Sequence, residues 1–266
     1  MKRWALLAFF VTRIALADET SDLFARGNDA LAEGKPNDAI AAFEALADRG
    51  VVDASLSFNR GLSYAARVRI NAGKPGDVGR AVHGFEEARS LSRDIALVRA
   101  AESALLLLRG EVARKQVGRG ASVEVDRPLP LSRTLSSALS ERTWNLICIF
   151  SSIIFAGALL VRSHMNERGR FAATILAVLL VPLWGYGFLM SQIASRNHDT
   201  RKEAVVVVEN LRLAGEQGVP LAGGDSLPEG ARLEVLSTRD GWSSIEWGRS
   251  KGYVPVGAIR LIVEGL

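Results

Sequence analysis

Two long runs of residues without a single charged side chain constrain this chain more than any other feature of its sequence. The first run covers residues 144–161, and the second covers residues 171–194. At the rise of 1.5 Å per residue in an α-helix, the runs are about 27 Å and about 36 Å long, and the hydrocarbon core of a bilayer is about 30 Å thick. We therefore predict a hairpin of two transmembrane helices, joined by a loop at residues 162–170.

The two predicted spans lack the groups that membrane transport requires. No Asp, Glu, Lys, Arg or His lies inside either run. Transporters and proton paths place such side chains within the membrane, where they hold or move the transported charge. We therefore expect the hairpin to be an anchor.

The start of the chain has the three-part pattern of a secretory signal peptide, which we assign to residues 1–17. Lys2 and Arg3 precede the apolar residues 4–11, and an Ala-Leu-Ala cleavage site ends at Ala17. The alternative is an N-terminal helix buried in the folded protein. A signal peptide would place both regions that flank the hairpin outside the cytoplasm and its loop inside. The three arginines of the loop agree, because cytoplasmic loops are rich in Lys and Arg.

The region before the hairpin shows a period of 34 residues, which is typical of tetratricopeptide repeats. Gly27 and Gly61 are one period apart, and an Ala-x3-Phe pair follows each of them. The i, i+4 spacing of that pair puts both side chains on one face of a helix. The signature residues, all expected to be structural, are Gly27, Ala39, Phe43, Gly61, Tyr64, Ala81 and Phe85. They predict a tetratricopeptide-like helical domain over residues 18–117; a plain helical bundle is the alternative.

Turn and capping residues divide this domain into five helices. Gly34-Lys35-Pro36 ends the first helix and begins the second, and the turn-rich residues 70–77 form a loop. Asp94 caps a fifth helix that begins at Ile95.

Residues 118–143 form a linker between the helical domain and the first span. Its glycines and prolines favour irregular structure. One segment is an exception, because leucines recur every four residues there and predict a short interfacial helix: Leu131, Leu135 and Leu139.

The hydrophobic pattern changes to that of β-strands at residue 203. Five segments are rich in β-branched or alternating residues, and we expect them to be strands: 205–208, 232–236, 242–247, 252–255 and 259–262. Asp240-Gly241 predicts a tight hairpin between two of them. Five short strands in about sixty residues indicate a small barrel.

The motifs of this segment resemble bacterial SH3 domains. They are Leu211-Arg212, Leu227-Pro228-Glu229-Gly230, Gly241-Trp242 and Gly252-Tyr253-Val254. The resemblance implies an SH3-like barrel over residues 203–266 that recognises peptides. An aromatic groove can hold an extended peptide, and the candidates are Trp242, Trp247 and Tyr253. The alternative is that these aromatic residues only fill the core of a small barrel.

Charge and chemistry argue against a nucleic-acid binder and against an enzyme. The net charge is +4, but residues 18–120 carry 15 basic and 15 acidic residues, and residues 203–266 carry 6 and 9. Neither region has the basic excess that nucleic acid requires. The single Cys148 excludes an internal disulfide or a cysteine-built zinc site. His83, His164 and His198 lie in separate regions, and no nucleotide-binding or hydrolase motif is present.

The sequence thus predicts a multidomain membrane protein with α-helical repeats, a two-helix hairpin and an all-β barrel. This order resembles BatE-type proteins of the aerotolerance (Bat) operons. The resemblance implies a bacterial inner-membrane protein without cofactor or metal, whose partners are von Willebrand A-type membrane proteins. We expect a non-enzymatic scaffold that presents two protein-binding modules on the extracytoplasmic side. One alternative is a cell-envelope sensor that binds peptidoglycan peptides through the SH3-like domain, and another is an enzyme with an unrecognised site.

Overall fold

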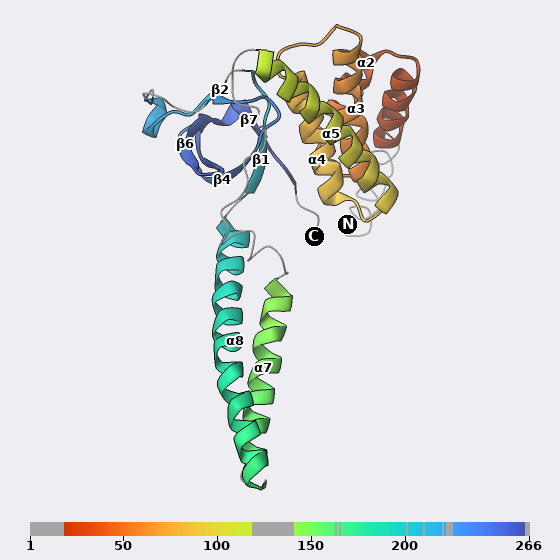
Figure 1. Ribbon diagram of the computed structural model, residues 1–266. Helices are drawn as coiled ribbons and strands as arrows, with labels where there is room; N and C mark the ends of the chain where they lie inside the picture. The colour runs from red at the N-terminus through yellow and green to blue at the C-terminus, as the bar shows by residue number, and fades with distance from the viewer. Residues whose placement is uncertain are drawn as a thin grey trace, which may run out of the picture. The chain divides into compact units, whose positions relative to one another are not determined.

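The computed structural model describes residues 19–118, 141–162, 164, 166–200, 202–209, 211–219, 221 and 226–263. The expected signal peptide and the expected interfacial helix lie outside these ranges. The chain forms two compact units: Met1–Arg127 and Lys202–Leu266 contribute to the first, and Pro128–Arg201 forms the second. The first unit therefore combines a helical region and a sheet that are separated in sequence by the second unit (Figure 1).

The described part of the helical region contains five helices, as the turn and capping residues predicted. They are residues 19–32, α2 (Pro36–Asp48), α3 (Ala54–Arg69), α4 (Asp77–Leu91) and α5 (Ile95–Gly118). Asp53 starts α3, because its carboxylate accepts hydrogen bonds from the backbone N–H groups of Ser55 at 2.8 Å and Leu56 at 3.0 Å. Asp94 caps α5 in the same way, because its carboxylate accepts a hydrogen bond of 2.8 Å from the backbone N–H of Ala96.

Each glycine of the 34-residue period packs against a phenylalanine of the next helix. A Cβ atom on Gly27 would lie 2.5 Å from Cε1 of Phe43. A Cβ atom on Gly61 would lie 3.1 Å from Cε1 of Phe85. The other signature residues, Ala39, Tyr64 and Ala81, are buried. The same contact between a small residue and a ring thus recurs one period later, and the signature residues lie in the helical core.

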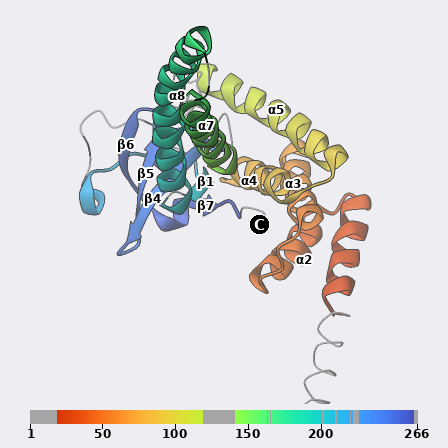
Figure 2. The ribbon, with the colours of Figure 1, turned by 90° about the horizontal axis from the view of Figure 1, so that it is seen from below.

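Helices α3 and α4 lie side by side and approach closely because Gly84 has no side chain (Figure 2). A Cβ atom on Gly84 would lie 2.7 Å from the carbonyl oxygen of Ser57 and 2.7 Å from the backbone nitrogen of Gly61. Both neighbours are backbone atoms of α3, so a larger residue can fit only if the two helices move apart.

We expect Gly84→Ala to lower the free energy of unfolding by about 1–3 kcal/mol, because the added methyl group overpacks this contact. Gly110→Ala is the matched control, since Gly110 is exposed on α5 and a Cβ atom there meets nothing within 4 Å. The control should be neutral or gain up to about 1 kcal/mol of helix propensity. Thermal unfolding of the detergent-solubilised chain, followed by circular dichroism, measures both. Equal effects of the two substitutions would contradict the close packing of α3 on α4.

The sheet of the first unit is antiparallel and has five strands, in the order β6-β5-β4-β1-β7. The strands are β1 (Lys202–Val206), β4 (Arg232–Arg239), β5 (Trp242–Trp247), β6 (Ser250–Pro255) and β7 (Ile259–Leu261). Each of the five predicted strands is therefore present, although the first begins three residues earlier than predicted and ends at Val206 instead of residue 208. A further pair, β2 (Leu211–Arg212) and β3 (Ser226–Leu227), was not among them. Short helical turns stand at η1 (Glu216–Gly218) and η2 (Val256–Ala258).

The sheet curves around its own hydrophobic core (Figure 1). The core includes buried side chains from β1, β4, β5 and β6, among them Ala204, Val206, Leu233, Val235, Ile245, Trp247 and Val254. The hairpin between β4 and β5 turns at Asp240 and Gly241, whose φ angles are 51° and 78°. Positive φ at both central residues is the requirement of a type I′ turn, so the predicted tight hairpin is confirmed.

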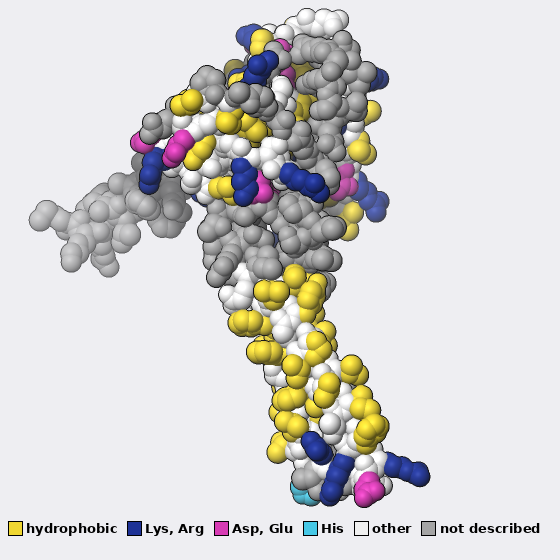
Figure 3. All heavy atoms as spheres, turned by 60° about the vertical axis from the view of Figure 1, so that its left-hand side comes forward, with side chains coloured by type: hydrophobic (Ala, Val, Ile, Leu, Met, Phe, Trp, Pro, Cys, Tyr) yellow, Lys and Arg dark blue, Asp and Glu magenta, His cyan; other side chains and the backbone are white. Residues whose placement is uncertain are grey.

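The second unit consists of two long apolar helices, α7 (Glu141–Arg162) and α8 (Glu167–Thr200), packed against each other. Among the described residues, two segments are long and apolar enough to cross a membrane, Arg142–Leu160 and Glu167–Gln192. Only 11% and 24% of the residues in the most apolar windows of these helices are buried, whereas the core helix of a soluble protein is mostly buried. Hydrophobic side chains cover the pair in Figure 3. The two long apolar helices of the prediction are confirmed.

Polar and aromatic contacts join the two apolar helices near the start of α7 and the end of α8. The hydroxyl group of Ser191 donates a hydrogen bond of 2.6 Å to Oδ1 of Asn145. The rings of Trp144 and Tyr186 meet edge to face with centroids 5.8 Å apart. The hydrogen bond pairs the hydroxyl group of Ser191 with the amide oxygen of Asn145 within the helix pair.

Candidate functional site

Two of the three aromatic residues expected to bind peptides lie on one face of the sheet. Trp242 on β5 is opposite Pro255 on β6, and Ser244 is opposite Tyr253. Because alternate residues of a strand share a face, Trp242 and Tyr253 are diagonal neighbours on the same surface. Both side chains are half-buried. The structure thus brings these two candidates together.

The chain between β2 and β3 covers part of this face. Ala214 and Tyr253 exchange backbone hydrogen bonds of 3.0 Å and 2.8 Å, which hold the segment against β6. Gly218 has a φ angle of 83°, and a Cβ atom there would overlap the indole ring of Trp242. Glycine is needed at this position for two reasons: it adopts the left-handed backbone conformation, and it lets the ring approach closely. The indole is therefore held by packing and does not swing freely.

Exposed apolar residues adjoin the backbone segments that pack against or flank Trp242. Val219 follows Gly218 and is 63% exposed, and Val256 is 42% exposed. The backbone N–H of Val256 donates to the carbonyl oxygen of Gly241 at 3.0 Å, which holds η2 beside Trp242. We call this surface the Trp242 patch; its members are Val219, Leu221, Trp242, Tyr253, Pro255 and Val256. Partly exposed aromatic rings among exposed apolar groups are typical of surfaces that bind other molecules.

Trp247, the third candidate, lies on the opposite face of β5. Its side chain is 1% exposed and belongs to the core of the sheet. A ligand on the Trp242 patch has no access to this ring. Of the two expectations for the aromatic residues, binding and packing, the location of Trp247 supports packing.

Replacing the two tryptophans of β5 should therefore have different consequences. We expect Trp247→Ala to cost about 3–5 kcal/mol of stability, because it removes a buried aromatic ring from a small core. Trp242→Ala should cost less than half as much, because part of its ring already faces water. Thermal unfolding of the two variants makes the comparison. A larger loss for Trp242→Ala would show that Trp242 is a core residue of this domain.

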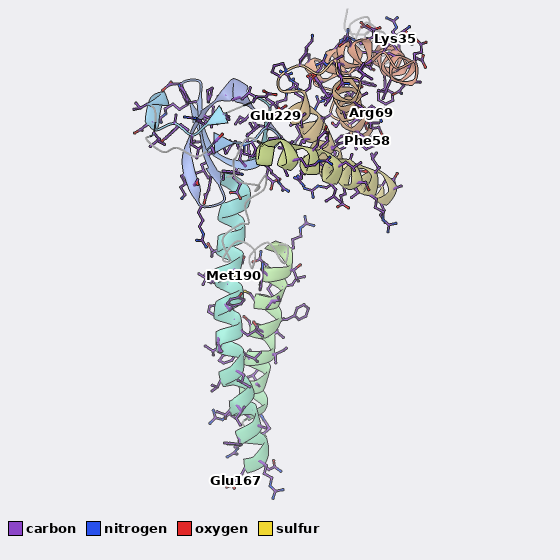
Figure 4. All side chains as sticks on the ribbon, turned by 45° about the horizontal axis from the view of Figure 1, so that its top comes forward. Lys35, Phe58, Arg69, Glu167, Met190 and Glu229 are labelled. Carbon is purple, nitrogen blue, oxygen red and sulfur yellow. The ribbon has the colours of Figure 1, made fainter. Side chains whose placement is uncertain are left out.

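The helical region packs directly against the sheet, a contact that was not predicted from the sequence. Val205 of β1 and Ile262 after β7 belong to the same hydrophobic cluster as Tyr64, Val82 and Phe85. At one edge of this contact, Oε1 of Glu229 accepts a hydrogen bond of 2.8 Å from the backbone N–H of Gly79 (Figure 4). We call this contact the helix–sheet junction. It makes one folded unit of two segments that are far apart in sequence.

An ion pair crosses the junction from α2 to β7. Both guanidinium Nη atoms of Arg260 donate to the carboxylate of Glu44, at 2.9 Å and 3.2 Å. Tyr64 also donates to Glu44, at 2.8 Å. Burial raises the pKa of Glu44, but its hydrogen bonds and the charge of Arg260 outweigh burial, so its pKa is below the ordinary value. Burial and the nearby Glu44 carboxylate raise the pKa of Tyr64 to about 12, so the phenol stays a hydrogen-bond donor.

A buried histidine forms a second polar contact across the junction. Nε2 of His83 lies 2.8 Å from the carbonyl oxygen of Leu261, and Nδ1 lies 3.3 Å from Nη2 of Arg60. The carbonyl can only accept and the guanidinium can only donate, so the imidazole is neutral, with its proton on Nε2. Arg60 itself is paired with Glu87 at 2.6 Å. Burial lowers the pKa of His83, against the smaller opposite effect of Glu87.

Stability should therefore fall as the pH drops through the ordinary titration range of histidine. The unfolded chain takes up a proton on His83 near pH 6.5, whereas the folded chain takes it up only at lower pH. The contribution of His83 is thus fully present above pH 6.5 and is lost below it. Thermal unfolding between pH 7.5 and pH 5.5 should show a smaller decrease for His83→Gln than for the unchanged chain. His164→Gln, which replaces an exposed histidine, should keep the full decrease.

The charged groups in and near the junction are held by partners. Glu86 accepts from Arg89 at 2.7 Å and from Arg109 at 2.6 Å. Glu86 and Arg89 border an open cavity of about 530 Å³, whose lining residues are Glu86, Arg89, Ser90, Glu102, Glu203, Arg232 and Ile262. Among the residues that the structure describes, no group of three or more His, Cys, Asp or Glu side chains is placed to hold a metal ion. The cavity is therefore a polar one in which arginines neutralise two of the carboxylates, Glu86 and Glu203.

A scan against models of protein families, a search of curated proteins and a search of solved structures each found no match to this chain. The candidate site thus stands on the geometry of the Trp242 patch and of the helix–sheet junction.

Proposed function

We propose that this chain is a non-enzymatic membrane scaffold that presents two protein-binding modules, its helical region and its sheet, and that the sheet binds its partner through the Trp242 patch. In this proposal the helices are tetratricopeptide-like repeats, the sheet is an SH3-like barrel, and α7 and α8 anchor both in the membrane. The partners are von Willebrand A-type membrane proteins, and the folded unit is extracytoplasmic. The observation that carries the proposal is the core shared by segments on both sides of the apolar hairpin.

The shared core supports a two-span anchor. Segments that share a core must lie on the same side of a membrane, because neither the junction's ion pair nor its histidine contact can form across a bilayer. A chain that crosses the membrane twice between these segments satisfies this requirement. The expected signal peptide would make that side the extracytoplasmic one.

The repeat contacts and the short strands support the two fold assignments. The small-residue contacts of Gly27 and Gly61 recur at the tetratricopeptide period and bring neighbouring helices together in the same way. The curved five-stranded sheet, with η2 directly before the last strand, has the proportions of an SH3-like barrel. In this setting the Trp242 patch would accept an apolar, extended segment of a partner.

Reporter fusions after Arg119 and after Leu266 test the membrane topology. We expect a reporter that works only outside the cytoplasm to be active at both positions. We also expect the chain to stay with the membrane on alkaline carbonate extraction. Reporters on opposite sides, or release of the protein by carbonate, would overturn the two-span anchor.

Binding to a partner tests the proposed surface. The full chain in lipid nanodiscs is titrated with the purified soluble domain of a von Willebrand A-type membrane protein from the same cells. We expect Trp242→Ala to weaken binding at least about ten-fold, because buried aromatic anchors dominate interface energies. Leu107→Ala, which shortens an exposed apolar side chain on α5, is the control and should bind normally. If the nanodiscs instead bind peptidoglycan stem peptides through Trp242, the chain is a cell-envelope sensor.

A further inference from the structure

Arginines gather at the end of the apolar hairpin where α7 ends and α8 begins (Figure 3). Arg162 closes α7, and Arg168 and Arg170 lie in the first turns of α8. All three side chains are exposed, as is the nearby His164. One acidic residue, Glu167, lies among them and is labelled in Figure 4. With histidine neutral, residues 162–170 carry a net charge of +2. We call these three arginines the hairpin-tip arginines.

The helix dipole does not favour two of these arginines. Asn166 caps α8, because its Oδ1 accepts a hydrogen bond of 3.1 Å from the backbone N–H of Gly169. The first turn of a helix carries a partial positive charge, so Arg168 and Arg170 stand where the helix dipole disfavours cations. An anion placed at this end of the hairpin would be attracted by all three guanidinium groups.

The surface next to the hairpin-tip arginines indicates which anion fits. Leu160 and Phe171 are 73% and 69% exposed, so the apolar surface of both helices continues to within a few residues of the charges. A phospholipid presents the matching pattern, since an apolar chain adjoins a negatively charged phosphate. Guanidinium groups bind phosphate oxygens through two parallel hydrogen bonds, which suits them to this headgroup.

We propose that the hairpin-tip arginines bind the headgroups of anionic phospholipids, with the acyl chains lying along the exposed apolar faces of α7 and α8. This inference rests on the membrane anchor of the proposed function. It adds a lipid preference to that anchor, and so favours membranes or membrane regions rich in anionic lipid.

Native mass spectrometry of the full chain in detergent, titrated with phosphatidylglycerol or with phosphatidylcholine of the same acyl chains, tests the proposal. Equal acyl chains leave the headgroup as the only difference. We expect tighter binding of phosphatidylglycerol, and about a five-fold loss of that affinity for Arg168→Gln alone. The triple variant Arg162→Gln, Arg168→Gln, Arg170→Gln should bind the two lipids equally.

A control variant removes the same number of charges elsewhere. Arg26, Arg69 and Arg99 are exposed arginines of the helical region, and their replacement by Gln should leave the lipid preference intact. The proposal would be overturned if the unchanged chain showed no preference for phosphatidylglycerol. It would also be overturned if the triple variant of the hairpin-tip arginines kept that preference. Carbonate extraction distinguishes failure of this inference from failure of the membrane anchor. If the chain stays in the membrane but shows no lipid preference, only the lipid inference fails. If carbonate releases the chain, both the anchor and the lipid inference fail.

Discussion

The packing of β1 between the sheet core and the helical region is the contact on which the first unit depends. Ala204 and Val206 face the core of the sheet, whereas Val205 lies in the cluster of the helices. Both faces of this strand are therefore buried, which is unusual for a small antiparallel sheet with water on one side. Without the helices, Val205 and Ile262 would be exposed. The sheet and the helical region thus each complete the other's hydrophobic core.

Polar contacts give the helix–sheet junction a defined geometry. The Glu44–Arg260 pair and the His83–Leu261 hydrogen bond connect β7 to two different helices. Loss of one partner would leave a charged or polar group buried without compensation, which costs more than the intact contact contributes. A sliding or rotated arrangement would break several of these contacts at once. The junction therefore fixes the orientation of the Trp242 patch relative to the helical region.

Local chemistry made much of this architecture predictable. The caps at Asp53 and Asp94 and the turn at Asp240-Gly241 act within a few residues, and the strand and helix positions followed from them and from hydrophobic periodicity. Strand alternation also separates Trp242 from Trp247, because an odd spacing puts two residues of a strand on opposite faces. Trp247 shares its face of the strand with Ile245, so the alternation would have assigned Trp247 to the core. The pairing of Trp242 with Tyr253 needs the register between strands, which depends on contacts that are distant in sequence.

The helix–sheet junction left one trace in the sequence, the uninterrupted β-branched run at residues 205–208. A half-exposed strand alternates, and a run without alternation indicates that both faces are covered. What covers the second face could not be deduced, because the partner surface lies more than one hundred residues away and is assembled from several helices. Its identity decides the topology. Because the cover is the helical region, a chain that enters a membrane between residues 118 and 202 must cross it an even number of times, and two crossings are the smallest such number above zero.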